Sequence, residues 1–165
     1  MKYMGSKGRI AKEILPIILK DRIPNQYYVE PFVGGCNSLD KVDGNRIASD
    51  TNKYIISMWK ALQSGWIPPR RVDREQYDCI KNNKENDLKL TGWVGIACSY
   101  SGKWFGGYAG NYPISRIKKN GLIPNYQDES YNTAIKQVGL LKGVIFYNLS
   151  YEELPIPQNS IIYCD

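Results

Sequence analysis

Residues Tyr27 to Gly35 read Tyr-Tyr-Val-Glu-Pro-Phe-Val-Gly-Gly, and this stretch decides the fold that we expect. Aromatic and β-branched residues come first and predict a buried strand. A carboxylate, Glu30, and a proline follow, and the two glycines then leave backbone that a ligand can approach closely. In an open α/β sheet, ligands bind just beyond the carboxyl ends of the strands. We therefore expect a binding site at the end of this strand.

Two further strands are predicted to end on an acidic residue. Arg46 to Ser49 leads into Asp50, and Ser160 to Asp165 leads into the carboxylate of its last residue. Asp50 follows Gly34 by 16 residues, about the spacing at which a Rossmann-type fold holds a nucleoside ribose. Each feature also has a simpler explanation. The glycines can form an ordinary strand-to-helix turn, and Asp50 can cap a helix that begins near Thr51.

The spacing of the glycines restricts the nucleotide that can bind. Gly34-Gly35-Cys36-Asn37-Ser38 matches neither the G-x-G-x-x-G fingerprint of dinucleotide sites nor the Gly-Lys-Ser/Thr of a P-loop. The turn is therefore not shaped for a pyrophosphate. A cofactor with an adenosine but no phosphate fits it better, and S-adenosylmethionine is the obvious one.

The order of the elements predicts an α/β fold with a parallel sheet and a helical insertion. Residues 1–65 form the first part of the sheet domain, residues 66–127 the insertion, and residues 128–165 the return to the sheet. Ser6 could cap the first helix, which Pro16 should kink or shorten. The expected helices are 7–20, 51–63, 73–83, 91–101 and 131–141, with a short helix near Asn37, and the expected strands are 26–29, 46–49, 144–147 and 161–164.

The charge distribution indicates a polyanionic partner. The net charge is +6, and residues 88–127 contain no acidic residue but five basic and seven aromatic ones. Basic charge mixed with aromatic rings suits phosphate contact and base stacking. The alternative is a solvated surface over an ordinary aromatic core, and composition alone does not separate the two.

Other function classes are disfavoured by what the composition lacks. The chain has no histidine, which removes Ser-His and Cys-His nucleophilic chemistry. The four cysteines have no paired spacing, so we expect reduced thiols and no metal site. We also expect no membrane partner and a cytoplasmic location, because the sequence shows neither a span of ~20 apolar residues nor an apolar signal region.

Four stretches resemble the motifs of the Dam-type DNA adenine methyltransferases of the alpha arrangement. They are Tyr3-Met4-Gly5-Ser6-Lys7, Val29-Glu30-Pro31-Phe32-Val33-Gly34-Gly35, Ala48-Ser49-Asp50-Thr51-Asn52 and Ile161-Ile162-Tyr163-Cys164-Asp165. The resemblance implies a Rossmann-like S-adenosylmethionine-dependent fold, with the target-recognition part in the insertion. The last stretch looks like the approach to the family's catalytic Asp-Pro-Pro-Tyr, whose Pro-Pro-Tyr is absent here. We therefore expect an incomplete sheet, and a chain that alone is inactive and lacks a C-terminal portion.

The resemblance also implies roles for individual residues, with double-stranded DNA as the partner. Asp165 would be catalytic and accept a hydrogen bond from the exocyclic amino group of adenine. The alternatives are a non-catalytic fragment that binds cofactor and DNA, an enzyme acting on cytosine or on RNA adenine, and, less well supported, a nucleotide-dependent oxidoreductase. The implied cofactor-binding residues are Tyr3, Gly5, Lys7, Glu30, Pro31, Phe32, Gly34 and Asp50, and the expected DNA-binding residues are Lys103, Trp104, Tyr108, Arg116, Lys118 and Lys119.

Overall fold

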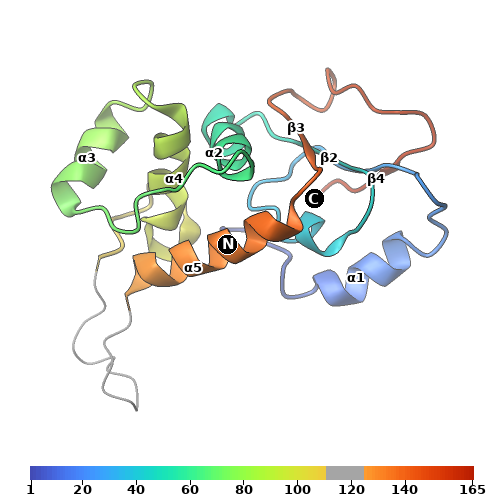
Figure 1. Ribbon diagram of the computed structural model, residues 1–165, viewed down its shortest axis with the longest axis horizontal. Coiled ribbons are helices and arrows are strands. Elements are labelled where there is room, and N and C mark those ends of the chain that lie inside the picture. Colours follow the sequence, from blue (N-terminus) through green and yellow to red (C-terminus); the bar gives the residue numbers. More distant parts are fainter. Residues whose placement is uncertain (111–124) are drawn as a thin grey trace, which may run out of the picture.

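The computed structural model describes residues 1–110 and 125–165. Within them, four parallel strands form one sheet in the order β3-β2-β1-β4, which confirms the predicted parallel sheet (Figure 1). The strands are β1 (Tyr28–Glu30), β2 (Arg46–Ser49), β3 (Ile145–Tyr147) and β4 (Ile161–Ile162). Because β1 lies between β2 and β4 and runs parallel to both, the residues that follow these three strands meet at one edge of the sheet.

Five α-helices and two short 3-10 helices accompany the strands in the described residues. The helices are α1 (Ala11–Ile18), α2 (Lys53–Gln63), α3 (Arg74–Asn82), α4 (Leu88–Ala97) and α5 (Tyr126–Leu140), with the 3-10 helices η1 (Leu39–Lys41) and η2 (Tyr100–Gly102). Helix α5 begins at Tyr126 rather than at the predicted Tyr131, because Asn125 caps it and accepts from the N–H groups of Gln127 and Asp128. No described helix has both the length and the apolar composition that a bilayer span requires.

The start of α1 differs from the prediction. Its first turn follows Ile10, which provides no side-chain cap. Ser6 does not cap the helix, because its Oγ accepts from the N–H of Gly8 at 3.1 Å instead. Pro16 lies inside α1, which ends at Ile18. The expected shortening of this helix is therefore confirmed, and the predicted cap is wrong.

Helix α2 joins the sheet to the helical insertion. Its core face is formed by Ile55, Ile56, Trp59 and Leu62, which are buried. Helix α4 packs against α2, and Gly92 permits the contact, because a Cβ at this position would lie 2.2 Å from the Tyr54 carbonyl oxygen. Figure 1 shows α3 and α4 on one side of α2 and the sheet on the other, with α5 running beneath both.

Candidate active site

The glycine turn after β1 and the acid after β2 face each other. The N–H of Gly34 donates to Asp50 Oδ2 at 3.0 Å. The other carboxylate oxygen, Oδ1, accepts from the N–H of Asn52 at 2.9 Å. Asp50 does not cap α2, since Asn52 is the N-cap residue. Each oxygen of Asp50 accepts one of these backbone bonds, and a carboxylate oxygen has room for a second.

The ring of Tyr3 lies against the glycine turn. A Cβ at Gly34 would be 2.6 Å from Tyr3 Cε1, and a Cβ at Gly35 would be 2.6 Å from Tyr3 Cβ. Gly34 also has a φ of +46°, a backbone conformation that is unfavourable for residues other than glycine. The turn therefore needs glycine for two reasons, its backbone conformation and the close approach of the N-terminal segment.

Glu30 ends β1 as a buried carboxyl, 4% exposed. The hydroxyl of Tyr28 donates to its Oε1 at 2.9 Å. Burial raises the pKa of Glu30 to about 7, although hydrogen bonds from Tyr28 and Ser38 oppose the shift. Glu30 is the last residue of β1, directly before Pro31. Its carboxyl group therefore lies at the edge of the sheet where a ligand would bind.

Lys7 connects the N-terminal motif to the residue that follows β4. Its Nζ lies 2.6 Å from Asp165 Oδ1 and donates to the Gly5 carbonyl at 3.2 Å. Both charged side chains are about one-third exposed, at 36% and 35%. An ion pair of this exposure contributes little to stability, but it places the Asp165 carboxylate beside the N-terminal motif.

A cavity of about 320 Å³ is enclosed by these segments. A volume of this size is at the lower end of the range for small-molecule sites. Pro31 does not line it, and Phe32 does so with a ring that is 48% exposed. The predicted site residues that line this strand-tip cavity are Tyr3, Gly5, Lys7, Glu30, Phe32, Gly34, Asp50 and Asp165.

Three residues around the glycine turn were not predicted. Asn37 lines the strand-tip cavity, and its Nδ2 is buried with no hydrogen-bond partner among the described residues. Trp59 and Gln137 donate hydrogen bonds to carbonyls of the turn. Asn37 could have been found from its position two residues after the glycines. The other two come from distant helices, and no local signal indicates them.

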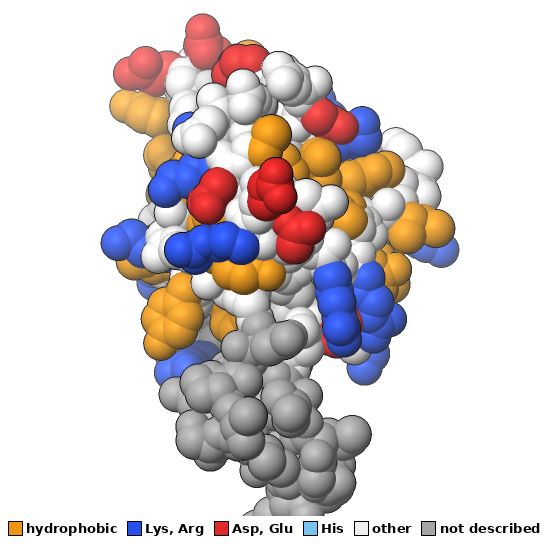
Figure 2. All heavy atoms as spheres, turned by 90° about the vertical axis from the view of Figure 1, so that its left-hand side faces the viewer, with side chains coloured by type: hydrophobic (Ala, Val, Ile, Leu, Met, Phe, Trp, Pro, Cys, Tyr) orange, Lys and Arg blue, Asp and Glu red, His pale blue; other side chains and the backbone are white. Residues whose placement is uncertain are grey.

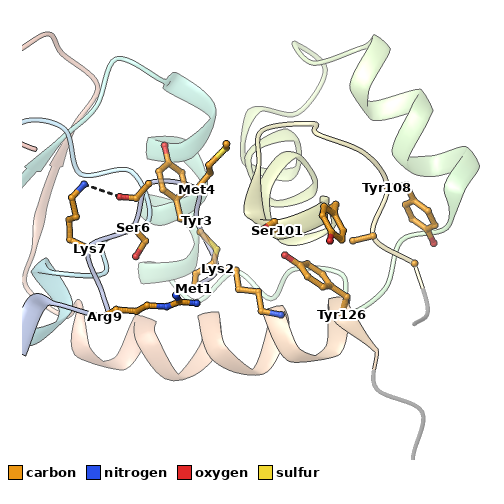
Figure 3. Close-up of a pocket in the computed structure, with 14 residues that line it drawn as sticks. Met1, Lys2, Tyr3, Met4, Ser6, Lys7, Arg9, Ser101, Tyr108 and Tyr126 are labelled. Atoms are coloured by element: carbon orange, nitrogen blue, oxygen red, sulfur yellow. Dashed lines mark hydrogen bonds between the residues drawn. The ribbon is translucent and has the colours of Figure 1, made fainter. Parts of the chain in front are cut away.

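A second, larger cavity of about 970 Å³ lies on the other side of the N-terminal segment. Figure 3 shows this segment, with Lys7 reaching toward the Gly5 carbonyl, on one side and Ser101, Tyr108 and Tyr126 on the other. The two cavities share one wall, residues 3–7. The N-terminal motif is thus the partition between them.

The predicted DNA-binding residues fall into three groups. Lys103 is exposed. Trp104 and Tyr108 are partly buried: the Trp104 ring stacks on Tyr54 with centroids 5.4 Å apart, and the Tyr108 hydroxyl donates to the Val72 carbonyl at 2.9 Å. Trp104 therefore packs the insertion against α2, and Tyr108 links two parts of the insertion. Arg116, Lys118 and Lys119 lie outside the described residues.

The face formed by the insertion carries both signs of charge. Figure 2 shows acidic side chains at its top and centre and basic ones toward its lower flanks. Arg70 and Arg71 both pair with Asp128, at 2.7 and 2.6 Å. In the described residues, this face therefore mixes acidic and basic side chains. The described part of the chain also contains no cluster of three or more Cys, Asp or Glu side chains that could hold a metal ion.

Comparison with known proteins gives the family. Residues 3–89 match the model of the D12 class N6 adenine-specific DNA methyltransferases. The matched range contains every predicted cofactor-binding residue, and it ends before Lys103 and Asp165. None of the curated proteins matches the chain. Because the matched range covers just over half of its length, this chain belongs to the D12 class of N6 adenine-specific DNA methyltransferases.

Proposed function

We propose that the strand-tip cavity binds S-adenosylmethionine and that Asp165 orients the adenine amino group of double-stranded DNA beside it. One observation supports this assignment above the others. Side chains from four separate stretches of the chain, which carry Lys7, Glu30, Asp50 and Asp165, line a single cavity of about 320 Å³. When bound, S-adenosylmethionine supplies an electrophilic methyl group on a sulfonium.

The groups in the cavity fit such a cofactor. Asp50 has acceptor capacity left for the hydroxyls of a ribose. Asn37 Nδ2 is a buried donor without a partner among the described residues, and a ligand that offers it an acceptor would remove the cost of leaving it unpaired. Glu30, buried beside the turn, would favour a cationic ligand once it is ionised. The glycine turn offers bare backbone and no arrangement for a diphosphate.

Asp165 supplies the acceptor that the reaction needs. The exocyclic nitrogen of adenine is a weak nucleophile because its lone pair is delocalised into the ring. A carboxylate that accepts one of the amino hydrogens moves the nitrogen toward tetrahedral geometry and localises that pair. Lys7, 2.6 Å from Asp165 Oδ1, positions the carboxylate, and correct positioning supplies a large part of the rate in such transfers.

The larger cavity offers a route for the target base. Adenine in a duplex must leave the base stack before its amino group can be reached. This cavity shares the wall of residues 3–7 with the strand-tip cavity. On its rim, Tyr100 is 66% exposed and offers a ring on which a base can stack. We therefore propose that the extruded base approaches from this side.

Calorimetric titration with S-adenosylmethionine tests the cofactor assignment directly. We expect one-site binding that a nicotinamide dinucleotide does not displace. A cavity that binds the dinucleotide in preference to S-adenosylmethionine would overturn the assignment. Asp50→Asn, compared with the exposed Asp43→Asn, shows whether the binding occurs at the strand tips.

The methylated product tests the substrate. Because the chain alone is expected to be inactive, it is supplied with the C-terminal portion that the family resemblance implies. The mixture is incubated with labelled S-adenosylmethionine and with DNA or RNA, and the nucleic acid is then digested to nucleosides. The proposal expects the label on N6-methyladenine from DNA. Label on N4-methylcytosine, or on adenine from RNA alone, would contradict it.

A further inference from the structure

Buried side chains from two helices hold the carbonyls of the glycine turn. Trp59 Nε1, on α2, donates to the Gly34 carbonyl at 3.0 Å. Gln137 Nε2, on α5, donates to the Gly35 carbonyl at 2.9 Å and to the Cys36 carbonyl at 3.1 Å. One amide thus holds two consecutive carbonyls of the turn that borders the strand-tip cavity.

The turn needs such support because its backbone is strained. Gly34 has a φ of +46°, and Cys36, which is not a glycine, has a φ of +55°. A residue other than glycine in this region costs free energy, and the conformation persists only where its surroundings impose it. Hydrogen bonds from a buried amide provide that constraint.

Gln137 is itself firmly held. It is 3% exposed, and its Oε1 accepts from the Met1 ammonium group at 2.5 Å. Its donor and acceptor sides are therefore both engaged, and the amide cannot rotate without losing bonds on both sides. The residue also lies outside residues 3–89, the range that the family model matches.

We propose that Gln137 is a positioning residue of the methyl-transfer site, which sets the shape of the Gly34–Cys36 turn that the cofactor meets. The inference rests on the proposed function, since it assumes that the cofactor lies beside this turn. It adds to that function a residue from α5, which is remote in sequence from every cofactor motif. Gln137 does not line the cavity, and it acts through the backbone of the turn.

The same helix offers a matched control. Gln127 is also a buried glutamine of α5, 3% exposed. It makes three hydrogen bonds, from Val72 N–H at 2.7 Å and to the carbonyls of Val72 and Ala109 at 2.9 and 3.0 Å. These partners belong to the insertion and not to the glycine turn. Loss of Gln127 therefore imposes the same kind of change on α5 without touching the turn.

The experiment compares Gln137→Met with Gln127→Met, since methionine preserves size and removes the hydrogen bonds. We expect Gln137→Met to weaken S-adenosylmethionine binding about tenfold, because the turn loses both hydrogen bonds to its carbonyls and part of that loss opposes cofactor binding. Gln127→Met should leave the affinity within about twofold. Equal affinity of Gln137→Met and wild type, or equal losses in both variants, would overturn the proposal.

Hydrogen exchange without any ligand separates this inference from the proposed function. Gln137→Met should speed exchange of the amides of residues 33–38, and Gln127→Met should speed exchange near residues 72 and 109. If the wild-type chain does not bind S-adenosylmethionine, the cofactor assignment fails. Hydrogen exchange then still tests whether Gln137 holds the conformation of the turn. Unchanged exchange in residues 33–38 contradicts the role of Gln137 whatever the cofactor.

Gln137→Glu adds a readout that a purely structural role would not move. An ionised glutamate cannot donate to the two carbonyls, whereas a protonated one can donate to one of them. The Met1 ammonium, 2.5 Å from the Gln137 Oε1 that this carboxylate replaces, favours the ionised form. Gln137→Glu should therefore bind S-adenosylmethionine as weakly as Gln137→Met between pH 5 and 8, although it keeps the contact with Met1. Wild-type affinity in Gln137→Glu would count against the proposal.

Discussion

The strand-tip site differs from the glycine- and aromatic-rich loop of the insertion, of which residues 101–110 are described, in how each uses its conspicuous residues. At the strand tips, Glu30 and Asp50 line a cavity together with the glycine turn. In the loop, Trp104 stacks on Tyr54, and the hydroxyl of Tyr108 binds the Val72 carbonyl. The polar residues that break the pattern of a strand line a cavity here, whereas Trp104 and Tyr108 pack against other parts of the chain.

The difference has a physical origin. A carboxyl in or directly after a buried strand has a high desolvation cost, so its presence there needs a reason such as a ligand. An aromatic ring in a loop gains free energy from any apolar neighbour. The first kind of residue is informative on its own, and the second becomes so only when its neighbours are known.

Trp104→Ala should have the largest effect on stability. If it does not destabilise the protein, the conclusion that the aromatic residues of the loop serve packing is wrong. Removal of a ring packed on Tyr54 and Phe105 should lower the free energy of unfolding by about 3 kcal/mol. Lys103→Ala, at the exposed neighbouring position, should change it by less than about 0.5 kcal/mol. Urea denaturation measures both. Unchanged stability in Trp104→Ala together with weaker DNA binding would make Trp104 a contact residue.

Gly34→Ala should weaken S-adenosylmethionine binding about a hundredfold, or by ~2.7 kcal/mol. The added Cβ would lie 2.6 Å from the Tyr3 ring, at a residue with a φ of +46°. Gly139→Ala on α5 is the control, since a Cβ there has no atom within 4 Å. Calorimetry should find its affinity unchanged. Wild-type affinity in Gly34→Ala would mean that the turn does not border the cofactor.

Glu30→Gln tests the cost of the buried acid. Its pKa is raised by burial to about 7, so between about pH 4.5 and 7 the native state binds more protons than the unfolded chain. Stability therefore falls as the pH rises through this window. The variant should gain about 3 kcal/mol over wild type between pH 4.5 and pH 8. Urea denaturation at the two pH values measures this difference. If the free energy of unfolding differs between variant and wild type by the same amount at both pH values, Glu30 carries no such cost.

Asp50→Asn should weaken S-adenosylmethionine binding about tenfold, or by ~1.4 kcal/mol. In wild type, the two carboxylate oxygens accept from the N–H groups of Gly34 and Asn52. The amide of the variant keeps one acceptor oxygen and therefore loses one of these two bonds. Asp43→Asn, the same change at an exposed position before β2, should bind as wild type does. If calorimetry finds equal losses in the two variants, the effect comes from net charge and not from the site.

Much of the fold follows from the sequence, and the support of the site does not. Strand β2 occupies the predicted residues, because glycine and asparagine precede it and Asp50 follows it. The parallel sheet follows from the order of the elements. The bonds from Trp59 and Gln137 to the glycine turn depend on how α2 and α5 pack, and a hydrogen bond across about a hundred residues leaves no local pattern. The early start of α5 was signalled by Asn125, an N-cap residue whose importance is clear only once the helix is known.

Lys103→Ala should have the smallest effect, and it sharpens the comparison from the side of the loop. If the loop meets DNA through exposed charge and not through its packed rings, removing this one cation should reduce the slope of log affinity against log salt by about 1. Lys60→Ala, at an exposed position on α2, removes the same charge away from the loop. Fluorescence anisotropy with a labelled duplex at several salt concentrations should show the reduced slope in Lys103→Ala alone. If both variants reduce the slope equally, the effect comes from the net charge of the protein and not from the loop. The residue types would then point to a binding role at the strand tips but not in the loop.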